Sequence, residues 1–505
     1  MNRRAIRRAM LPVAGMLIAA LPGCAVGPST RVDPAVPAVS ARASSGTSAE
    51  TRGFLDSLRT VRSRETGDSA VRTTSSITSQ LPAQSLGIER SATEMPSWTE
   101  ILRDSVLESL IRLAVNNNRN LRVAQQRINE FRALRGVAAS RFFPQINAGS
   151  TVASNKIALA ASAPIEFDAA RVTTDLAWEL DFWGRTRRAT QAAGFDLAGR
   201  EDDVRAVTVS LVSDVVSAYL QLREADAIIA IAEQTLVSRE ATLQLARRRF
   251  EQGLISELDV RQFEATVADP AARVADYARQ RTEWENALSL LLGTSPQGIP
   301  RGRLLSDIVK TVDVPDTIPG DLLARRPDVL RAQHDFQAAT ARVGVAQAAR
   351  LPAITVTGQY GAQRPTYGQV FDGRGEIYTL QAGVSIPLFT GGRLSNEQKA
   401  ARARAEQSRN VYEQVVLVAL REASDAATGV KLRRDQLAAQ QTQERALQAA
   451  YAIAERRYAS GISSYLEVLD AQRGLFTAQL TRVQVERQYL AATVQLFRAL
   501  GGGWE

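Results

Sequence analysis

The feature that most constrains this fold is an internal repeat. When the 505-residue chain is aligned with itself at an offset of 208 residues, similar residues coincide along most of the shifted length. The matching pairs are Asn120-Leu121 with Asp328-Val329, Ala124-Gln125 with Ala332-Gln333, Phe143-Pro144-Gln145-Ile146 with Leu351-Pro352-Ala353-Ile354, Gly184-Arg185 with Gly392-Arg393, Arg249-Phe250 with Arg457-Tyr458, Gly253 with Gly461, and Leu292-Gly293 with Leu500-Gly501. One constant offset over this length indicates two copies of a single structural unit.

The repeat divides the chain into segments. We place the first unit at residues 98–293, and the second at residues 319–505 together with a C-terminal tail. A connector at residues 294–318 contains Pro296, Pro300 and Pro315. Residues 24–97 are rich in Ser, Thr, Ala and Arg and poor in aromatic residues, which is typical of a low-complexity tether.

The N-terminus resembles a secretory signal. Four arginines precede a mainly apolar run at residues 9–20, which ends in Leu21-Pro22-Gly23-Cys24; they are Arg3, Arg4, Arg7 and Arg8. The run is too short to span a membrane, so we expect residues 1–23 to be a lipoprotein signal peptide. Cys24 is the only cysteine and therefore has no partner for an internal disulfide. We expect it to be lipidated and to become the mature N-terminus, the alternative being a free cysteine beside the cleavage site. The residue after Cys24 is Ala25 rather than Asp, and in this it resembles bacterial lipoproteins that are sorted to the outer membrane.

Composition excludes several classes of protein. No stretch after the signal reaches 18 apolar residues, which excludes a helical membrane protein. The formal net charge of +9 becomes +5 once the four signal arginines are removed, and the remaining charges alternate in sign. The chain therefore lacks the basic patch of a nucleic-acid-binding protein.

Within each unit the hydrophobic period changes from helix to strand and back. Apolar residues recur at helical spacing from Leu107 to Ile128, until Pro144 ends the pattern. Strict alternation then predicts β-hairpins at about residues 145–182 and 352–389, for example where Leu176, Trp178 and Leu180 alternate with polar or small residues. Alternation of this kind suits a transmembrane β-barrel wall with a wet lumen, and equally a soluble sandwich packed on a core.

Each hairpin is followed by a very long helical segment. The segments run from about Arg185 to Phe250 and from about Arg393 to Tyr458 without an internal proline. At 1.5 Å per residue each helix reaches roughly 95 Å, far beyond an ordinary globular helix. A soluble coiled coil explains these helices but leaves the strands and the signal unexplained.

Four strands per chain cannot close a membrane barrel, because the smallest have about eight strands. An open sheet edge in lipid leaves backbone groups without hydrogen bonds. The chain therefore has to oligomerise if it spans a membrane, and three copies supply twelve strands.

The sequence resembles the TolC-like outer membrane factors of tripartite efflux pumps, in the lipoprotein branch called the NodT type. The match runs from about Trp98 to Gly501. The segments that carry it are Trp98, Asn118 to Ala124, Phe143-Pro144, Trp178-Glu179-Leu180-Asp181-Phe182-Trp183-Gly184-Arg185, Leu323-Ala324-Arg325-Arg326-Pro327-Asp328, and Ile386-Pro387-Leu388-Phe389-Thr390-Gly391-Gly392-Arg393.

The resemblance implies a mainly α fold with a small β part. It implies a homotrimeric twelve-stranded β-barrel, with four strands per chain, that continues into a long α-helical barrel crossing the periplasm. It also implies the function of an outer-membrane exit duct that works with a periplasmic adaptor and an inner-membrane pump of the RND type. A duct for a type I secretion or metal-efflux system shares this fold, and a non-transporting coiled-coil lipoprotein is the remaining alternative.

The turn at the far end of each long helix carries a second pattern. An arginine and an aromatic residue precede a glycine, which supplies a left-handed helix stop, and a serine then caps the next helix. The residues are Arg249, Phe250, Gly253, Ser256 and Asp259 in the first unit, and Arg457, Tyr458, Gly461 and Ser464 in the second. A helix-glycine-cap-helix turn is common by itself; the resemblance implies that these two tips dock the adaptor.

Just beyond the second tip, Glu467 and Asp470 are three residues apart and share one helix face. The resemblance implies that they constrict the periplasmic entrance as a gate. The first unit lacks the second acid, because Gln262 stands at the position equivalent to Asp470. A solvated helix face is the plainer interpretation of two such acids.

The sequence offers no catalytic constellation. His334 is the only histidine and lies in a helical segment. The sequence therefore offers too few residues for a Cys/His metal site, and only this one histidine for a Ser-His-Asp triad. We therefore expect no enzymatic activity, no metal, and no cofactor besides the lipid on Cys24. The resemblance leaves the exported compound open.

Overall fold

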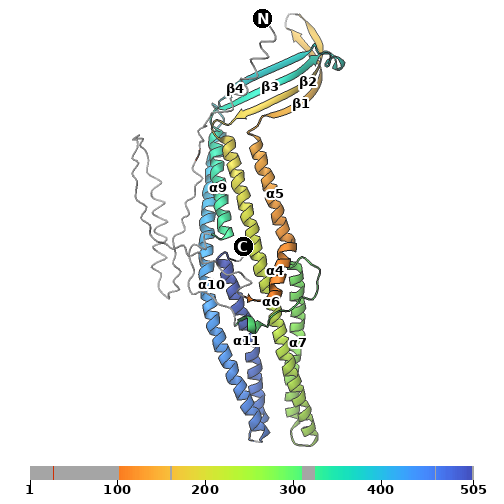
Figure 1. The fold of residues 1–505 in the computed structure, drawn as a ribbon, viewed down its shortest axis with the longest axis vertical. Helices are drawn as coiled ribbons and strands as arrows, with labels where there is room; N and C mark the ends of the chain where they lie inside the picture. The colour runs from red at the N-terminus through yellow and green to blue at the C-terminus, as the bar shows by residue number, and fades with distance from the viewer. Residues whose placement is uncertain (1–26, 28–101, 160–161, 310–324, 461, 503–505) are drawn as a thin grey trace, which may run out of the picture.

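The computed structural model describes Gly27 and residues 102–159, 162–309, 325–460 and 462–502. The predicted signal peptide, almost all of the predicted tether and the end of the predicted connector lie outside these residues. The chain is elongated, with a β-sheet at one end and two helix-to-helix turns at the other (Figure 1). No helix among the described residues is long and apolar enough to cross a membrane.

The repeat predicted from the sequence is confirmed element by element. Helix α5 (Arg119–Ser140) corresponds to α9 (Pro327–Ala348), α6 (Arg185–Glu251) to α10 (Arg393–Ala459), and α7 (Glu257–Leu291) to α11 (Tyr465–Ala499). Each pair begins and ends at the same offset of 208 residues. Helices α6 and α10 each have 67 residues, which is about 100 Å of helix.

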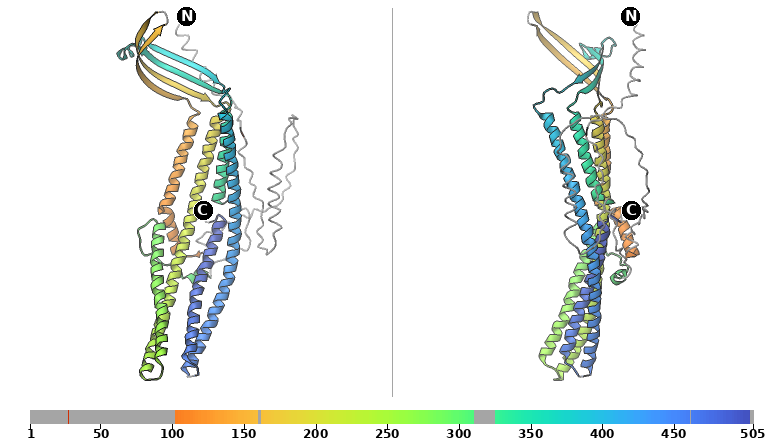
Figure 2. Two further views of the ribbon diagram at one scale, coloured as in Figure 1. Left: turned by 180° about the vertical axis from the view of Figure 1, so that it is seen from behind. Right: turned by 90° about the vertical axis from the view of Figure 1, so that its left-hand side faces the viewer.

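Four helices lie side by side along most of the length. On the half nearest the sheet the order is α10, α9, α6, α5, and on the far half it is α10, α11, α6, α7. The long helices α6 and α10 run through both halves, so they join them into a curved layer (Figure 2). One edge of the layer is α10 and the other is α5 followed by α7.

The helix expected ahead of Pro144 is two helices, and the sequence analysis missed the break. Helix α4 (Ser105–Asn117) ends where the Asn118 side chain accepts a hydrogen bond from the Leu121 backbone N–H at 3.1 Å, capping α5. The Asn118 amide also donates to the Leu291 carbonyl at the end of α7, at 2.9 Å. A residue that prefers caps to helix interiors thus ties α4, α5 and α7 together.

The predicted hairpins are present as β1 (Gln145–Leu159) with β2 (Ser162–Leu180), and β3 (Ala353–Arg364) with β4 (Glu376–Ser385). They form one antiparallel sheet in the order β1-β2-β3-β4. The register places Asn147, Asp175, Gln359 and Thr379 in one row across the four strands. The adjacent row consists of Ile146, Leu176, Gly358 and Leu380.

Adjacent rows point to opposite faces, so the sheet has a polar face and an apolar face. Among the described residues no α-helix packs on either face, and the short 3-10 helix η2 (Tyr367–Gln369) contacts β2. Ile146 and Leu380 are 64% and 69% exposed within the single chain. The exposed apolar face argues against the soluble sandwich, whose apolar face would be covered by a core.

Two clusters of polar side chains link elements near the middle of the helical layer, and the first is centred on Asp104. Asp104 caps α4 and accepts hydrogen bonds from the Tyr219 hydroxyl at 3.0 Å and the Arg303 backbone N–H at 2.9 Å. Gly302 lies so close to Asp104 that a Cβ there would overlap the carboxylate. The start of the connector is thereby fixed against α4 and α6.

The second cluster is centred on Arg326, which belongs to the sequence motif at residues 323–328. Arg326 is buried and binds the Asp328 carboxylate, the Glu422 carboxylate of α10 at 2.7 Å, and the Ala499 carbonyl of α11 at 3.0 Å. It therefore joins the start of α9 to the end of α11, which gives this part of the motif a structural role.

Candidate functional site

The first tip, between α6 and α7, has the geometry expected from its sequence. Gly253 has a φ of +69°, and the backbone N–H groups of Gly253 and Leu254 donate to the carbonyls of Phe250 and Arg249. This is the left-handed helix stop that glycine favours. Ser256 then caps α7 in a capping box with Asp259, whose carboxylate accepts from the Ser256 backbone N–H at 2.9 Å.

Capping fixes the protonation state of Asp259. Its hydrogen bonds from the Ser256 hydroxyl and backbone N–H lower the pKa of the carboxyl. The acid equivalent to Glu467 in the first repeat is therefore an ionised helix cap at neutral pH.

The second tip, between α10 and α11, follows the same path with one difference. Ile462 donates from its backbone N–H to the Arg457 carbonyl at 2.9 Å, as Leu254 does to Arg249. Ser464 lies at the N-cap of α11, as the sequence predicts, but unlike Ser256 its side chain makes no capping hydrogen bond. Gly461 lies outside the described residues.

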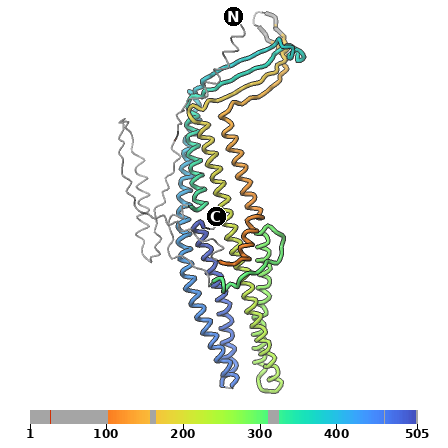
Figure 3. Tube along the Cα trace, viewed as in Figure 1, coloured from red at the N-terminus to blue at the C-terminus, as the bar shows by residue number. Residues whose placement is uncertain are grey.

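The two tips lie at the same end of the molecule (Figure 3), and their side chains contact each other. The Arg249 guanidinium donates a hydrogen bond to the Tyr458 hydroxyl and lies 5.4 Å from the centroid of that ring. The reciprocal pair would be Arg457 with Phe250, which has no hydroxyl. Arg457 instead lies 3.9 Å from Glu467 of its own hairpin. The contact between the tips is thus one-sided.

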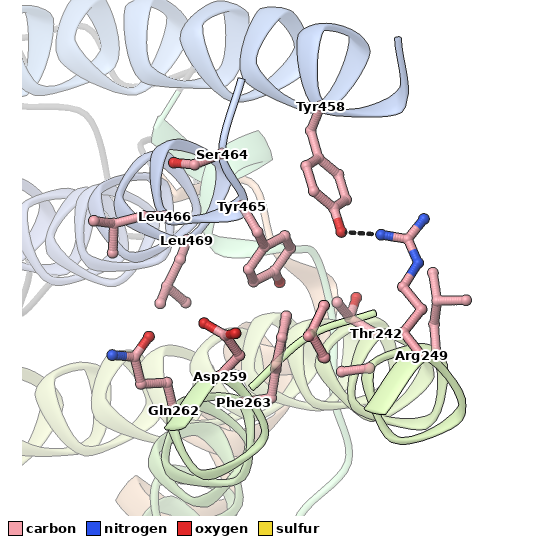
Figure 4. A pocket seen from close by; sticks show the side chains of 13 residues that line it. Thr242, Arg249, Asp259, Gln262, Phe263, Tyr458, Ser464, Tyr465, Leu466 and Leu469 are labelled. Carbon is pink, nitrogen blue, oxygen red and sulfur yellow. Dashed lines mark hydrogen bonds between the residues drawn. The ribbon is translucent and has the colours of Figure 1, made fainter. Parts of the chain in front are cut away.

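An aromatic chain continues from this contact into the space between the tips. The rings of Tyr458 and Tyr465 meet edge to face with centroids 5.1 Å apart, and Tyr465 lies 4.2 Å from Phe263 of α7. Figure 4 shows Tyr458, Tyr465 and Phe263 around a cavity of about 410 Å³, with Leu469 and Gln262 on its other side. Burial raises the pKa of the Tyr465 hydroxyl to about 12.

Tyr465 and Phe263 were not predicted as site residues from the sequence. Their signal was weak, because an aromatic residue one or seven positions after a cap is equally typical of helix packing. Only the tertiary approach of the two hairpins brings the rings together.

The outer ends of both tips expose apolar side chains. Leu254 and Leu258 of the first tip are 67% and 66% exposed, and their repeat equivalents Ile462 and Leu466 are 69% and 63% exposed. Phe250 is also exposed. Exposed apolar side chains gathered at one end of a molecule are typical of a binding surface.

The two candidate gate acids lie on the first turns of α11, and both are exposed. Glu467 faces Arg457, as described above. Asp470 makes no ion pair among the residues that the structure describes. Their equivalents in the first repeat are Asp259, which is occupied as a cap, and Gln262, which lines the cavity. The acidic pair belongs to the second hairpin alone.

Two further expectations concern chemistry. His334 bonds through Nδ1 to the buried carboxylate of Asp202 at 2.7 Å, which joins α9 to α6. In the described ranges no three His, Cys, Asp or Glu side chains gather as metal ligands. Cys24 lies outside the described residues, so its lipidation stays a prediction.

Comparisons with known proteins agree with this geometry. The family model described as outer membrane efflux protein matches residues 110–294 and again residues 318–502. A toluene efflux pump outer membrane protein of Pseudomonas putida, TtgF, is 33% identical over 416 residues, covering 81% of this chain and 86% of that protein. The outer membrane protein OprJ of Pseudomonas aeruginosa is 34% identical over 426 residues, covering 81% and 86%.

Solved structures resemble the whole described fold. A crystal structure of CusC superposes with a TM-score of 0.76 at 28% identity, covering 82% of this chain and 96% of that one. The outer-membrane channel OprN superposes with a TM-score of 0.75 at 29% identity, covering 81% and 93%. The open state of the MtrE outer membrane channel of Neisseria gonorrhoeae gives 0.72 at 26% identity, covering 80% and 90%.

Proposed function

Because this chain belongs to the outer membrane efflux protein family, we propose that it is the exit duct of a tripartite efflux pump. In this role it conducts drugs or other small molecules passively from the periplasm to the exterior and catalyses no reaction. The observation that carries the proposal is a sheet with an uncovered apolar face, held about 100 Å of helix away from two exposed tips.

The apolar face of the sheet suits contact with lipid. A membrane-inserted sheet has no free edges, because backbone groups in lipid need hydrogen-bond partners. Strands β1 and β4 are the two edge strands of this sheet. Pairing β4 of one copy with β1 of the next closes a barrel, and three copies give the twelve strands of a homotrimer.

The helical layer supports the same assembly. Its α5 edge exposes Val123 and Val137, and its α10 edge exposes Val411 and Leu432. Two different edges that pack against each other make a head-to-tail contact, which closes into a ring when the rotation is right. We therefore propose that α5 of one copy packs on α10 of the next, continuing the barrel across the periplasm.

The tips are the proposed contact with the rest of the pump. They lie at the end farthest from the sheet, and Leu254, Leu258, Ile462 and Leu466 expose apolar surface there. We propose that a periplasmic adaptor binds this surface and connects the duct to an inner-membrane pump of the RND type. The names of the relatives, which include toluene and antibiotic efflux pumps, support a cargo of small apolar compounds.

Two further parts of the proposal concern the ends of the duct. Three copies of Glu467 and Asp470 would form a negatively charged ring at the periplasmic entrance if they face the trimer axis. At the other end, a lipid on Cys24 would anchor the mature protein in the outer membrane, where its relatives are found.

Purified protein in detergent tests the proposal directly. We expect chemical crosslinking to give a trimer, planar bilayers to show conductance, and deletion of the gene to sensitise cells to toluene-like compounds. Monomers without conductance would contradict the duct. Loss of protein secretion with unchanged drug sensitivity would assign the duct to a type I secretion system.

A further inference from the structure

A proline interrupts the hydrogen bonding of α7 in the first tip hairpin. Pro270 lies inside α7 and has no backbone N–H. In an α-helix that N–H would donate to the carbonyl four residues earlier, which belongs to Thr266. Thr266 is 4% exposed, so water does not readily satisfy its carbonyl. A buried carbonyl without a donor is costly, and the fold has to supply one.

Arg239 of α6 supplies the missing donor. Its Nη1 atom donates to the Thr266 carbonyl at 2.5 Å, and the same atom lies 3.6 Å from the Asp269 carboxylate. The guanidinium also lies 5.1 Å from the centroid of the Phe476 ring on α11. Arg239 therefore fastens the break in α7 and at the same time packs the first hairpin on the second.

The second hairpin has neither the break nor the arginine. Leu447 is the repeat equivalent of Arg239, Ala478 of Pro270, and Gly474 of Thr266. A Cβ added to Gly474 would lie 3.4 Å from Leu447, so an apolar side chain stands here where the first hairpin has its arginine. An open hollow of about 450 Å³ next to Leu447 also includes Gln443 and Arg473. The two hairpins are equal in length, but only the first has the proline and the arginine that binds the freed carbonyl.

The Arg239 side chain is only partly hydrogen-bonded where it packs against the second hairpin. Arg239 is 2% exposed, yet its Nε and Nη2 atoms have no hydrogen-bond partner among the described residues. Gln472, one turn before Phe476 on α11, likewise has a buried Oε1 without a partner there. Burial lowers the pKa of the Arg239 guanidinium, with the nearby Asp269 opposing the shift. Separating the hairpins would hydrate these groups.

We propose that Arg239 is a positioning residue for opening of the duct, with Pro270 as the hinge of the first hairpin. Its bond to Thr266 keeps α7 in one shape while the hairpins are together. Its unpartnered N–H groups lower the cost of parting them, because water satisfies these groups once α6 and α11 separate. The inference rests on the proposed duct function. It places the point of movement at Arg239 and Pro270, which lie outside the tips.

A double-mutant cycle tests the fastening. Arg239→Leu and Pro270→Ala copy the second hairpin one residue at a time. Arg239→Leu should lower the Tm of the purified trimer, whereas Pro270→Ala should not, because alanine restores a helix N–H for Thr266. The double variant should therefore regain most of the Tm lost by Arg239→Leu. If Arg239→Leu lowers the Tm equally in the wild type and in the Pro270→Ala variant, Arg239 does not serve the carbonyl freed by Pro270.

A reciprocal transplant guards against a variant that merely fails to fold. Ala478→Pro should destabilise the second hairpin, because it frees the Gly474 carbonyl and because Leu447, at the position equivalent to Arg239, has no donor to bind it. Adding Leu447→Arg should recover part of that loss. Failure of the arginine to rescue the introduced proline would count against the same mechanism.

Planar-bilayer recording tests the role in opening. The Arg239→Leu, Pro270→Ala double variant should open less often than wild type, on the order of tenfold, because the buried unsatisfied donors are gone. Equal open probability in the two proteins would overturn the proposal while leaving the duct intact. Absence of conductance in wild type would instead contradict the duct itself.

Discussion

Arg249 of the first repeat and Tyr458 of the second are joined by a hydrogen bond that their own repeat equivalents cannot form. Arg249 donates to the Tyr458 hydroxyl, whereas the repeat equivalent of Tyr458 is Phe250, which has no hydroxyl, and Arg457 lies 3.9 Å from Glu467 of its own hairpin. The hydrogen bond between the tips therefore runs in one direction only, beside the ring contact of Tyr465 with Phe263. A tyrosine at position 458 and a phenylalanine at position 250 account for this asymmetry.

Tyr458→Phe should loosen the apposed tips. The change removes the hydroxyl that accepts from Arg249 and keeps the ring on Tyr465, so it should weaken the contact by about 1 kcal/mol. We expect open probability in bilayers to rise by roughly fivefold. Phe250→Tyr is the opposite change, since it adds a hydroxyl at the equivalent place without removing a contact, and it should not raise open probability. The contact has no part in opening if Tyr458→Phe conducts like wild type.

Gly253→Val should disturb the first tip and leave the trimer intact. A β-branched residue at a φ of +69° is strained by roughly 1–2 kcal/mol, and the strain is confined to the turn. We expect crosslinking to the adaptor and drug resistance to fall together. Gly429→Val is the control, because Gly429 lies inside α10 with open space around it. Gly461→Val should act alike at the second tip. Docking at the tips is contradicted if crosslinking and resistance survive in both tip variants.

Neutralising the proposed acidic ring should change ion selectivity more than stability. Glu467→Gln with Asp470→Asn should weaken cation selectivity and block by divalent cations, because six carboxylates in the trimer would lose their charge. The change in trimer stability should stay within about 1 kcal/mol, since both side chains are exposed. Asp470→Asn alone distinguishes the effect of the acidic ring from the effect of losing the contact between Arg457 and Glu467, because it leaves that contact in place. Unaltered selectivity would place both acids on an outer face.

Cys24→Ser should abolish lipid attachment. The thiol is the atom that would be acylated, so the variant should take up no labelled palmitate and should shift partly to the soluble fraction. Barrel insertion can hold the remainder in the membrane. The measurement is metabolic labelling followed by fractionation. A wild-type protein that takes up no label would refute the lipid anchor.

Much of the fold was predictable because the repeat constrains every element twice. The helices α6 and α10 share their bounds, and Gly184 and Gly392 precede them with φ values of +78° and +83°. Alternation also gave the strands, since register follows from which face is apolar. Helix breaks were harder to predict. Asn118 ends one helix and starts the next through a tertiary bond to Leu291.

The site was predictable only in part. Gly253 and Ser256 act through local backbone geometry, which sequence spacing encodes directly. Arg249 and Tyr458 were identified as tip residues, but their mutual bond depends on how two hairpins 208 residues apart lie side by side. Arg239 was missed for the same reason. Its signal was Pro270, a proline in a helical segment of the first repeat with alanine at the equivalent position of the second.

The equal length of α6 and α10 has a consequence for how such a chain can change in size. Seven residues inserted into α6, with seven more in α7 to match it, would lower the first tip by about 10 Å and leave the second where it is. Arg249 would then lose its hydrogen bond to Tyr458, and the two tips would no longer be level with each other. We therefore expect insertions and deletions in the first hairpin to be tolerated only when the second hairpin changes by the same number of residues. Among relatives of different length, we expect the two halves to lengthen or shorten in step.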